Sequence, residues 1–356
     1  MAVQIRALVV DDSALMRKLI PDLLESDSHI EVVDTARDGV EAVDKTIRLR
    51  PDVVVMDIQM PRMSGLEALD HIMSRCPVPV VVLTGLTDPS LAIEALEKGA
   101  VDFVLKPSGP ISVDIYKVRQ ELIEKVRLAA LANIRKNAWW AGPLVFPPAS
   151  FVTTSGDGWT GPSRSRAVAI GASTGGPKAL EYILGSLPTN LPAPLLVVQH
   201  MPPGFTRSFA RRLNERSRLM VKEAKDGDFV LPGWVYLAPG GYHMLVERRG
   251  GREIIRLDRS PPVKGLRPSA DMTMCSVAEV YEAGSIGVIL TGMGSDGVEG
   301  LKAIKMRGGV TIAQDEATSI IYGMPRVAAR SGWVDRVLPL DRIPGSIELV
   351  LAEERS

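Results

Sequence analysis

A serine in a tight, glycine-rich turn is the first feature of the sequence that can do chemistry. Gly171, Ser173 and Gly175 match the pattern G-x-S-x-G, directly after an apolar run and before an amphipathic one. In that pattern a sharp strand-to-helix turn exposes the serine hydroxyl. Backbone N–H groups and the positive end of a helix dipole also meet at such a turn. The motif alone therefore leaves two uses open, stabilising a tetrahedral oxyanion or binding phosphate.

A nucleophilic serine needs a base and a group that orients the base. His200 directly follows an apolar run, at the strand end where functional side chains gather in this architecture. Asp296 follows another apolar run and can orient an imidazole and stabilise its charged form. The chain order is then Ser, His, Asp, which differs from the order of the α/β-hydrolases. The other histidines are His29 and His71, at unremarkable positions, and His243, for which a structural role is favoured.

A glycine-rich loop offers a competing interpretation. Gly292, Gly294 and Gly297 match G-x-G-x-x-G, and Asp315 follows at roughly the 20-residue spacing of a dinucleotide-binding fold. That motif normally opens the first βαβ unit, whereas two β/α units precede it here. Asp296 lies inside the loop and would repel a pyrophosphate. The serine hydrolase interpretation is therefore favoured over nucleotide binding.

Five polar residues follow apolar runs in the first third of the chain. They are Asp11, Asp12, Asp57, Thr84 and Lys106. Three converging carboxylates repel each other unless a hard cation such as Mg²⁺ lies among them, and a lysine and a hydroxyl beside them can hold an anion. This set suits phosphoryl transfer to a carboxylate, with Asp57 as the acceptor. The alternative is that each Asp only caps a helix.

The elements that must position these residues alternate between strand and helix. Near-continuous apolar strands predict a five-stranded parallel sheet covered on both faces, which is a doubly wound α/β domain. The same alternation resumes at residue 166 and predicts a second α/β parallel-sheet domain with a β-hairpin insertion, turning at Gly250 and Gly251. The expected strands of the first domain are residues 6–10, 31–36, 53–56, 78–83 and 102–105.

The segment between the two domains has a different composition. Residues 137–165 are rich in Pro, Gly, Ser and Thr and show little periodicity, which is typical of a linker. A helix is expected over residues 112–135. We predict a first domain over residues 4–121, a linker over 122–165 and a second domain over 166–354.

Composition excludes several classes of protein. The 356 residues are 46% hydrophobic and 24% charged, as in ordinary globular chains. Two distant cysteines, Cys76 and Cys275, argue against a disulfide framework or a zinc site and suit a reducing cytoplasm. No signal peptide or membrane-spanning run is found, so we expect a soluble intracellular protein without membrane insertion.

The net charge of zero conceals an asymmetry. Residues 1–107 carry 11 Lys and Arg against 18 Asp and Glu, whereas residues 166–356 carry 24 against 20. The second half is too weakly basic for a typical nucleic-acid binder, so no nucleic-acid partner is expected. The opposite signs suggest two domains that attract each other.

The first third resembles the receiver domain of two-component response regulators, through VDDSALMR, MDIQMPRMSGLEAL, the position of Thr84 and FVLKP. The resemblance implies a flavodoxin-like fold in which a histidine kinase phosphorylates Asp57. It also implies that Mg²⁺ is held by Asp11, Asp12, Asp57 and the backbone carbonyl of Gln59. Thr84, Lys106 and the switch aromatic Phe103 would support the site. Ser64 is a departure, because the family often has Asp there.

The second domain resembles the catalytic domain of chemotaxis protein-glutamate methylesterases, through AIGASTGGP, VVQHMPPGFT, YLAPGGYHM, PSADMTMCSVA and LTGMGSDG. The order of receiver, linker and catalytic domain matches that family over nearly the whole chain. The resemblance implies that Ser173 is the nucleophile, His200 the general base and Asp296 the orienting carboxylate, with the backbone N–H groups of Thr174 and Met293 as oxyanion donors.

The same resemblance implies the substrate and the regulation. The family hydrolyses glutamyl methyl esters on chemoreceptor helices and deamidates certain receptor glutamines, without a cofactor for the esterase reaction. It also implies that the unphosphorylated receiver covers the active site.

Two rival functions remain open at this stage. One is a response regulator whose second domain only binds, for instance to DNA, although no compact basic helix-turn-helix pattern is found. The other is a general hydrolase of small esters. The expected helix 205–217 carries four arginines that either form a solvated face or dock on acidic receptor helices: Arg207, Arg211, Arg212 and Arg216.

Overall fold

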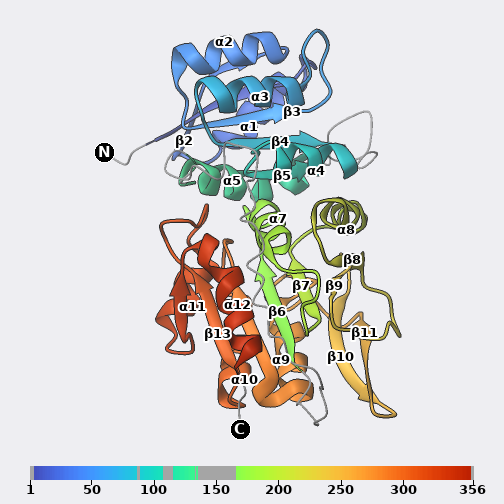
Figure 1. Ribbon diagram of the computed structural model, residues 1–356. Coiled ribbons are helices and arrows are strands. Elements are labelled where there is room, and N and C mark those ends of the chain that lie inside the picture. The colour runs from blue at the N-terminus through green and yellow to red at the C-terminus, as the bar shows by residue number, and fades with distance from the viewer. Residues whose placement is uncertain (1–3, 86–88, 107–114, 133, 135–165, 354–356) are drawn as a thin grey trace. The chain divides into compact units, whose positions relative to one another are not determined.

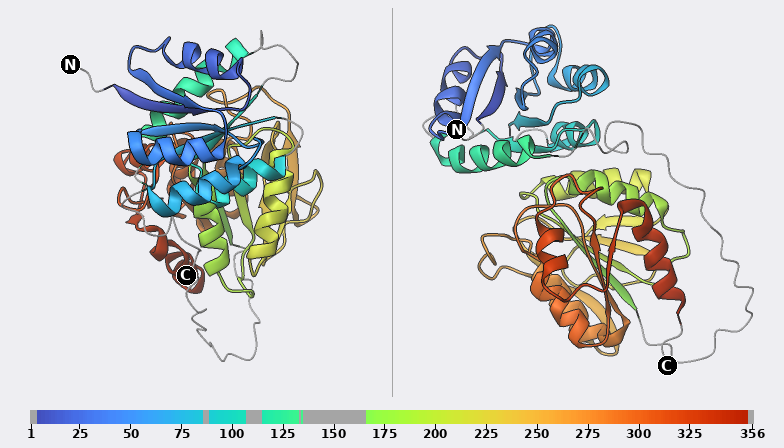
Figure 2. Two further views of the ribbon diagram at one scale, coloured as in Figure 1. Left: turned by 90° about the horizontal axis from the view of Figure 1, so that it is seen from above. Right: turned by 90° about the vertical axis from the view of Figure 1, so that its left-hand side faces the viewer.

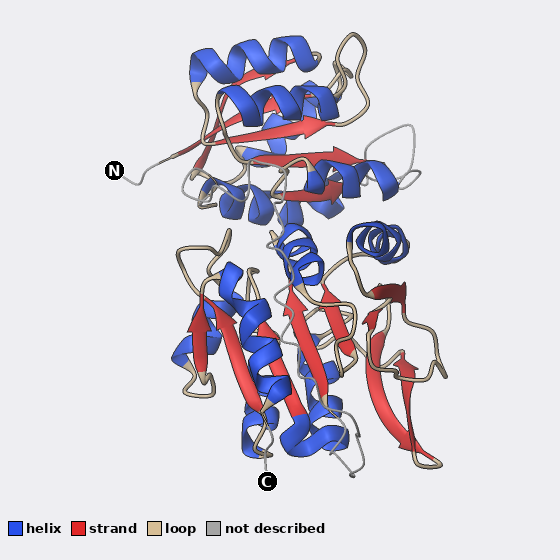
Figure 3. Cartoon of the chain, viewed as in Figure 1, coloured by secondary structure: helices blue, strands red, loops and turns tan. Residues whose placement is uncertain are grey.

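The computed structural model describes residues 4–85, 89–106, 115–132, 134 and 166–353, without the side chains of residues 115–117. The chain divides into two compact units, Met1–Pro143 and Leu144–Ser356. Strands and helices alternate along the sequence in both units, apart from four successive strands over residues 220–258 (Figure 3). None of the helices in the described part of the chain is both long and apolar enough to cross a membrane.

The first unit is built on a five-stranded parallel sheet (Figure 1). Its strand order, β2-β1-β3-β4-β5, is that of the flavodoxin-like doubly wound folds. Val9 of β1 pairs with Thr35 of β2 on one side and with Val55 of β3 on the other. The central strands are buried on both faces, which explains why the sequence reads there as unbroken apolar runs. The strands are β1 (Ile5–Val10), β2 (Ile30–Ala36), β3 (Val53–Asp57), β4 (Val80–Thr84) and β5 (Asp102–Leu105).

Five helices lie in the described part of this unit, and the predicted doubly wound fold is confirmed. The third helix begins at a capping box in which Ser64 Oγ accepts from Glu67 N while Glu67 binds Ser64 N at 2.8 Å. Ser64, the departure noted in the sequence, therefore has a local structural use. The fifth helix packs on β5 and on the first helix, and it runs across residue 121. The helices are α1 (Met16–Leu24), α2 (Gly39–Leu49), α3 (Gly65–Arg75), α4 (Pro89–Glu97) and α5 (Ile115–Ala130).

The second unit contains a seven-stranded sheet of order β14-β13-β12-β6-β7-β9-β8. Every neighbouring pair in it is parallel. The sequence predicts five of these strands, over residues 167–171, 195–199, 286–290, 310–313 and 334–338. It did not separate β8 and β9 from the hairpin region, because runs of four residues show too little periodicity. The strands are β6 (Ala167–Ala172), β7 (Leu195–Gln199), β8 (Met220–Glu223), β9 (Trp234–Leu237), β12 (Ser285–Ile289), β13 (Val310–Gln314) and β14 (Arg336–Leu338).

The predicted hairpin is present beside this sheet. Its strands β10 (His243–Arg249) and β11 (Arg252–Asp258) pair antiparallel. Gly250 and Gly251 form the turn with φ of 57° and 77°, the left-handed values that a two-residue type I′ hairpin requires.

Helices lie on both faces of the seven-stranded sheet (Figure 2). Right-handed crossovers place them there, because the strand order runs in opposite directions on the two sides of β6. One group packs on β6 and β12, and the other packs around the first helix of the unit. The first group includes α9 (Ala270–Tyr281) and α10 (Val298–Met306), and the second includes α7 (Gly176–Ser186), α8 (Phe205–Arg216) and α12 (Ile343–Ala352); α11 (Met324–Arg330) follows β13.

Candidate functional sites

The strand order places three polar residues at one point of the second unit. β12, β6 and β7 are neighbours, and the order of the chain through the sheet reverses at β6. In open parallel sheets, ligands bind at the carboxyl ends of the strands beside such a reversal. Ser173 follows β6, His200 follows β7 and Asp296 lies in the loop after β12. The topology thus brings together residues that are up to 123 positions apart in the sequence.

Ser173 lies in the sharp turn that the sequence predicted. Its N–H donates to the Thr291 carbonyl at 3.1 Å, and its own carbonyl accepts from Gly176 N at 2.7 Å. Gly175 has φ of 77°, and a Cβ there would lie 2.9 Å from the Cβ of Ile320. Only glycine therefore fits at this position of the turn.

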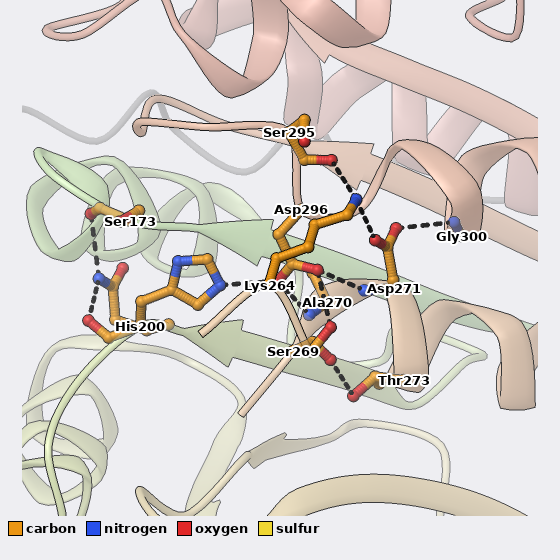
Figure 4. A network of polar contacts seen from close by, with 11 residues as sticks. Ser173, His200, Lys264, Ser269, Ala270, Asp271, Thr273, Ser295, Asp296 and Gly300 are labelled. Carbon is orange, nitrogen blue, oxygen red and sulfur yellow. Dashed lines mark hydrogen bonds and ion pairs between the residues drawn. The ribbon is translucent and has the colours of Figure 1, made fainter. Parts of the chain in front are cut away.

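His200 and Asp296 form a buried pair. The Nε2 of His200 lies 2.8 Å from Oδ2 of Asp296, and their side chains are 9% and 0% exposed. In Figure 4 the imidazole lies between Ser173 and Asp296. In the chymotrypsin-like triad the carboxylate binds Nδ1 and the serine faces Nε2. Here the carboxylate occupies Nε2, so Nδ1 is the nitrogen left to act as a base.

Asp296 also binds the first turn of α9. Its Oδ1 accepts from Ser269 Oγ at 2.7 Å and from Asp271 N at 3.1 Å, and its Oδ2 accepts from Ala270 N at 2.6 Å. Burial alone would raise the pKa of this carboxyl. The hydrogen bond and charge of His200, together with Ser269 and Ala270, outweigh burial and hold the pKa well below its ordinary value. Asp296 is therefore ionised at neutral pH.

Sequence reasoning gave Ser269 no role. It is the first residue of the helix that the sequence predicts over residues 269–282, and a serine at such a start ordinarily caps its own helix. In the structure its hydroxyl makes no such capping bond and binds Asp296 instead. A serine at a helix start was the available signal, but its partner comes from a distant loop.

A second ion pair holds the loop that carries Asp296 (Figure 4). Lys264 Nζ donates to Asp271 Oδ2 at 2.9 Å and to the Ser295 carbonyl at 3.2 Å. Asp271 Oδ1 accepts from Gly300 N at 3.0 Å. Burial, with the nearby charge of Asp296, raises the pKa of Asp271 against the opposing effect of Lys264. The pair joins the start of α9 to the residue before Asp296.

Thr174 and Met293, the expected oxyanion donors, lie in loops whose peptide planes are anchored. The carbonyl of the Gly292–Met293 peptide accepts from Met324 N at 2.7 Å. In a planar trans peptide the N–H points opposite to the carbonyl, so this bond fixes the direction of the Met293 N–H. A Cβ at Gly292 would lie 2.7 Å from the Cβ of Ser173, so glycine lets this loop approach the serine.

Thr291 joins these loops, and sequence reasoning missed it. Its side chain is fully buried. Its Oγ1 lies 3.0 Å from the Thr174 carbonyl, to which it donates, and accepts from Ile321 N at 2.9 Å, while its N–H donates to Gln314 Oε1 at 2.8 Å. A polar residue directly after an apolar strand was the only signal for it in the sequence.

The residues that suggested a dinucleotide-binding motif have structural roles in the fold. The Asp315 carboxylate accepts from Thr318 N at 2.9 Å and from Thr318 Oγ1 at 2.6 Å, within its own turn. Gly297 is the N-cap of α10 with φ of 94°. His243 is fully buried, with Nε2 3.2 Å from the Pro261 carbonyl, as a structural histidine would be.

The acidic cluster of the first unit is also assembled. Asp11, Asp12 and Asp57 each offer an oxygen, all within 4.8 Å of one another. Lys106 Nζ lies 2.7 Å from Asp11 Oδ2 and 2.8 Å from Asp57 Oδ2. Burial raises the pKa of Asp57, Asp11 adds to the rise and Lys106 opposes it. Although burial would lower the pKa of Lys106, Asp57 and Asp11 raise it. An all-oxygen donor set with excess negative charge fits Mg²⁺.

The supporting residues of the first unit lie at or near the same edge of its sheet. Thr84 ends β4 and is buried, and Gln59 is exposed two residues after the end of β3. Phe103 is buried in β5, with Lys125 Nζ 5.2 Å from its ring centroid.

Arg207 and Arg216 of α8 form ion pairs within the second unit. Arg207 Nε lies 3.2 Å from Glu223 Oε2, and Arg216 Nη1 lies 2.8 Å from Glu181 Oε1. Arg211 is exposed. The docking interpretation of this helix is therefore best tested at Arg211.

The comparisons with known proteins agree over nearly the whole chain. Residues 168–347 match the sequence model of the CheB methylesterase family, and residues 7–114 match that of the response regulator receiver domain. A protein-glutamate methylesterase/protein-glutamine glutaminase of Pyrococcus abyssi is 48% identical and spans 97% of this chain and 93% of the relative. One from Symbiobacterium thermophilum is 49% identical, with 98% of both chains covered.

Structural similarity points the same way. The crystal structure of the Thermotoga maritima CheB methylesterase catalytic domain is 48% identical, with a TM-score of 0.51, and covers 52% of this chain and 98% of that one. The full-length relatives, the order of the two family matches and this likeness of fold in about half of the chain agree with one another. This chain belongs to the CheB methylesterase family.

Proposed function

We propose that this chain hydrolyses methyl esters of glutamate side chains in chemoreceptors and converts particular receptor glutamines to glutamate. The buried His200–Asp296 pair beside the Ser173 turn carries the proposal. The names of the full-length relatives support the choice of substrate. A second domain that only binds is not favoured by any of these observations.

In the proposed mechanism, Nδ1 of His200 takes the proton of Ser173, and the serine oxygen attacks the ester carbonyl. The N–H groups of Thr174 and Met293 receive the oxyanion, and each such donor typically contributes about 3 kcal/mol to the transition state. His200 then passes its proton to the departing methanol. Water attacks the acyl-enzyme with His200 as base and releases glutamate, and a glutamine substrate releases ammonia instead.

Asp296 stays ionised throughout this cycle because its pKa is held low. Its charge stabilises the imidazolium that forms at each proton transfer, and its bond to Nε2 keeps the proton off Nδ1 in the resting enzyme.

We further propose that Asp57 accepts a phosphoryl group from a histidine kinase. Asp11, Asp12, Asp57 and the Gln59 carbonyl would hold Mg²⁺, which when bound neutralises charge on the phosphoryl oxygens. Lys106 and Thr84 would bind those oxygens. Phe103, at the position of the switch aromatic, would change conformation on phosphorylation. The acidic cluster and the receiver match support this assignment.

The proposed organisation is a receiver over residues 4–121, a linker over 122–165 and a catalytic domain over 166–354, acting in the cytoplasm. We propose that the unphosphorylated receiver restrains the esterase. The opposite charge of the two halves supports a polar, releasable contact. Arg211 is the proposed contact with acidic receptor helices.

The test is methanol release from methylated receptor by the wild-type chain and by Ser173→Ala. We expect loss of turnover by a factor on the order of 10⁶, as in comparable triads. Phosphorylation of Asp57 serves as the control and should continue in the variant. Methanol release by Ser173→Ala near the wild-type rate would refute the proposed mechanism, and a wild-type chain with no turnover would refute the proposed function.

A further inference from the structure

We propose that the side-chain amide of Gln199 is a positioning group for the oxyanion site. It fixes the orientation of the peptide that carries the Thr174 N–H, and it links that peptide to the backbone carbonyl of His200. This inference rests on the proposed esterase function and assigns a new residue to it.

Gln199 lies between the nucleophile and the base. It is the last residue of β7, where it pairs with Ala172 of β6, and its side chain is 2% exposed. Its Nε2 donates to the Ser173 carbonyl at 3.0 Å and to the His200 carbonyl at 3.3 Å. A primary amide has two hydrogens, so one Nε2 can serve both carbonyls.

The bond to Ser173 acts on the Thr174 N–H. The carbonyl of Ser173 and the N–H of Thr174 belong to one planar peptide and point in opposite directions. Gly176 N donates to the same carbonyl at 2.7 Å. One hydrogen bond allows a peptide plane to rock about it, whereas two donors from different directions fix its tilt. The amide therefore restricts the direction of the expected oxyanion donor.

Stability alone does not explain this side chain. Among the described residues no group donates to its buried Oε1. A buried acceptor without a partner destabilises a fold. The backbone has also made room for the amide, because a Cβ at Gly176 would overlap Oε1. An apolar side chain of similar length would avoid the unpaired oxygen, so the amide is accounted for by what its nitrogen holds.

Gln199→Met tests the proposal on methylated receptor, since it keeps the length of the side chain and removes the donor. We expect kcat to fall 10- to 100-fold and KM to stay within about twofold, while the melting temperature falls by no more than it does in the control variant. The control is Thr311→Val near the start of β13, which removes a buried hydroxyl that donates to the Trp333 carbonyl. It should lower the melting temperature and leave kcat unchanged.

Gln199→Glu supplies a pH signature that a merely structural role would not produce. Its carboxylate repels the Ser173 carbonyl, but its protonated form donates one hydrogen bond there. The ratio of variant to wild-type kcat should therefore rise as the pH falls from 8 to 6.

The outcomes separate the two claims. Wild-type kcat in Gln199→Met, with turnover by the wild-type chain, overturns the positioning role and leaves the esterase intact. A fall in kcat that only tracks a fall in melting temperature, with a flat pH ratio for Gln199→Glu, also overturns it. No turnover by the wild-type chain overturns the function and this inference together.

Discussion

Replacing Asp296 by Asn should cost about 10³- to 10⁴-fold in kcat for the proposed ester hydrolysis. The carboxylate lies 2.8 Å from Nε2 of His200. With charge centres about 4 Å apart and an effective dielectric near 20, its attraction for the imidazolium is about 4 kcal/mol, or about 10³-fold in rate. The rest of the loss comes from the tautomer. An Asn amide that donates to Nε2 moves the ring proton to Nδ1, which can then no longer accept the Ser173 proton.

The same change has a structural cost that can be measured separately. Each oxygen of Asp296 accepts from one backbone N–H of α9, Asp271 N or Ala270 N. Whichever oxygen becomes the NH₂ group, one of these N–H groups loses its acceptor, at a cost of about 1–3 kcal/mol. We therefore expect unfolding in urea to have its midpoint at a lower urea concentration but to stay cooperative.

The assay is methanol release from methylated receptor under saturating conditions. Ser269→Ala is the matched control, because it removes one hydrogen bond to Asp296 and leaves its charge. We expect that control to stay within about tenfold of wild type, since a hydrogen bond to a charged group contributes about 1.5–3 kcal/mol and only part of it acts in the transition state. An Asp296→Asn enzyme within tenfold of wild type would refute the assigned charge role.

Three further predictions concern other parts of the chain. Thr291→Val removes the acceptor of the buried Ile321 N–H and should lower the free energy of unfolding in urea by about 1–3 kcal/mol, whereas Thr291→Ser keeps the hydroxyl and should cost less than about 1 kcal/mol; equal losses would contradict this. Asp57→Asn should abolish stimulation by a small phosphodonor but keep basal methanol release, and continued stimulation would mean another acceptor. Burial raises the pKa of Cys275 to about 11. In Cys76→Ser, alkylation of Cys275 at pH 8 should thus be on the order of 10²-fold slower than for a free thiol and rise with pH, and mass spectrometry showing a plateau by pH 9 would refute it.

The sequence predicted the fold because strand burial and strand ends leave strong local signals. Unbroken apolar runs such as 53–56 occur where helices cover both faces of a parallel sheet. Each residue of the candidate triad follows such a run, so its placement at one sheet edge needed no tertiary information. The Gly250–Gly251 turn was equally local.

The parts that sequence did not predict depend on contacts between distant loops. Ser269 binds a carboxylate 27 positions away, and Thr291 bonds to a carbonyl 117 positions away. The choice of Nε2 for Asp296 follows from how the loop after β12 meets the first turn of α9, which no spacing in the sequence encodes. Helix α12 was missed because the expected elements ended with the strand over 334–338.

Because Asp296 accepts hydrogen bonds from the first turn of α9, local opening of that helix is coupled to the protonation of Asp296 and His200. Any fluctuation that frays its first turn withdraws two donors from the carboxylate at once, so proton affinity at Asp296 and exchange of the Ala270 and Asp271 amides with solvent deuterium share one equilibrium. A substrate whose binding favours the protonated form of His200 would keep Asp296 ionised and so stabilise the first turn of α9. The rate of hydrogen–deuterium exchange at the Ala270 and Asp271 amides should therefore fall as the His200 imidazole becomes protonated.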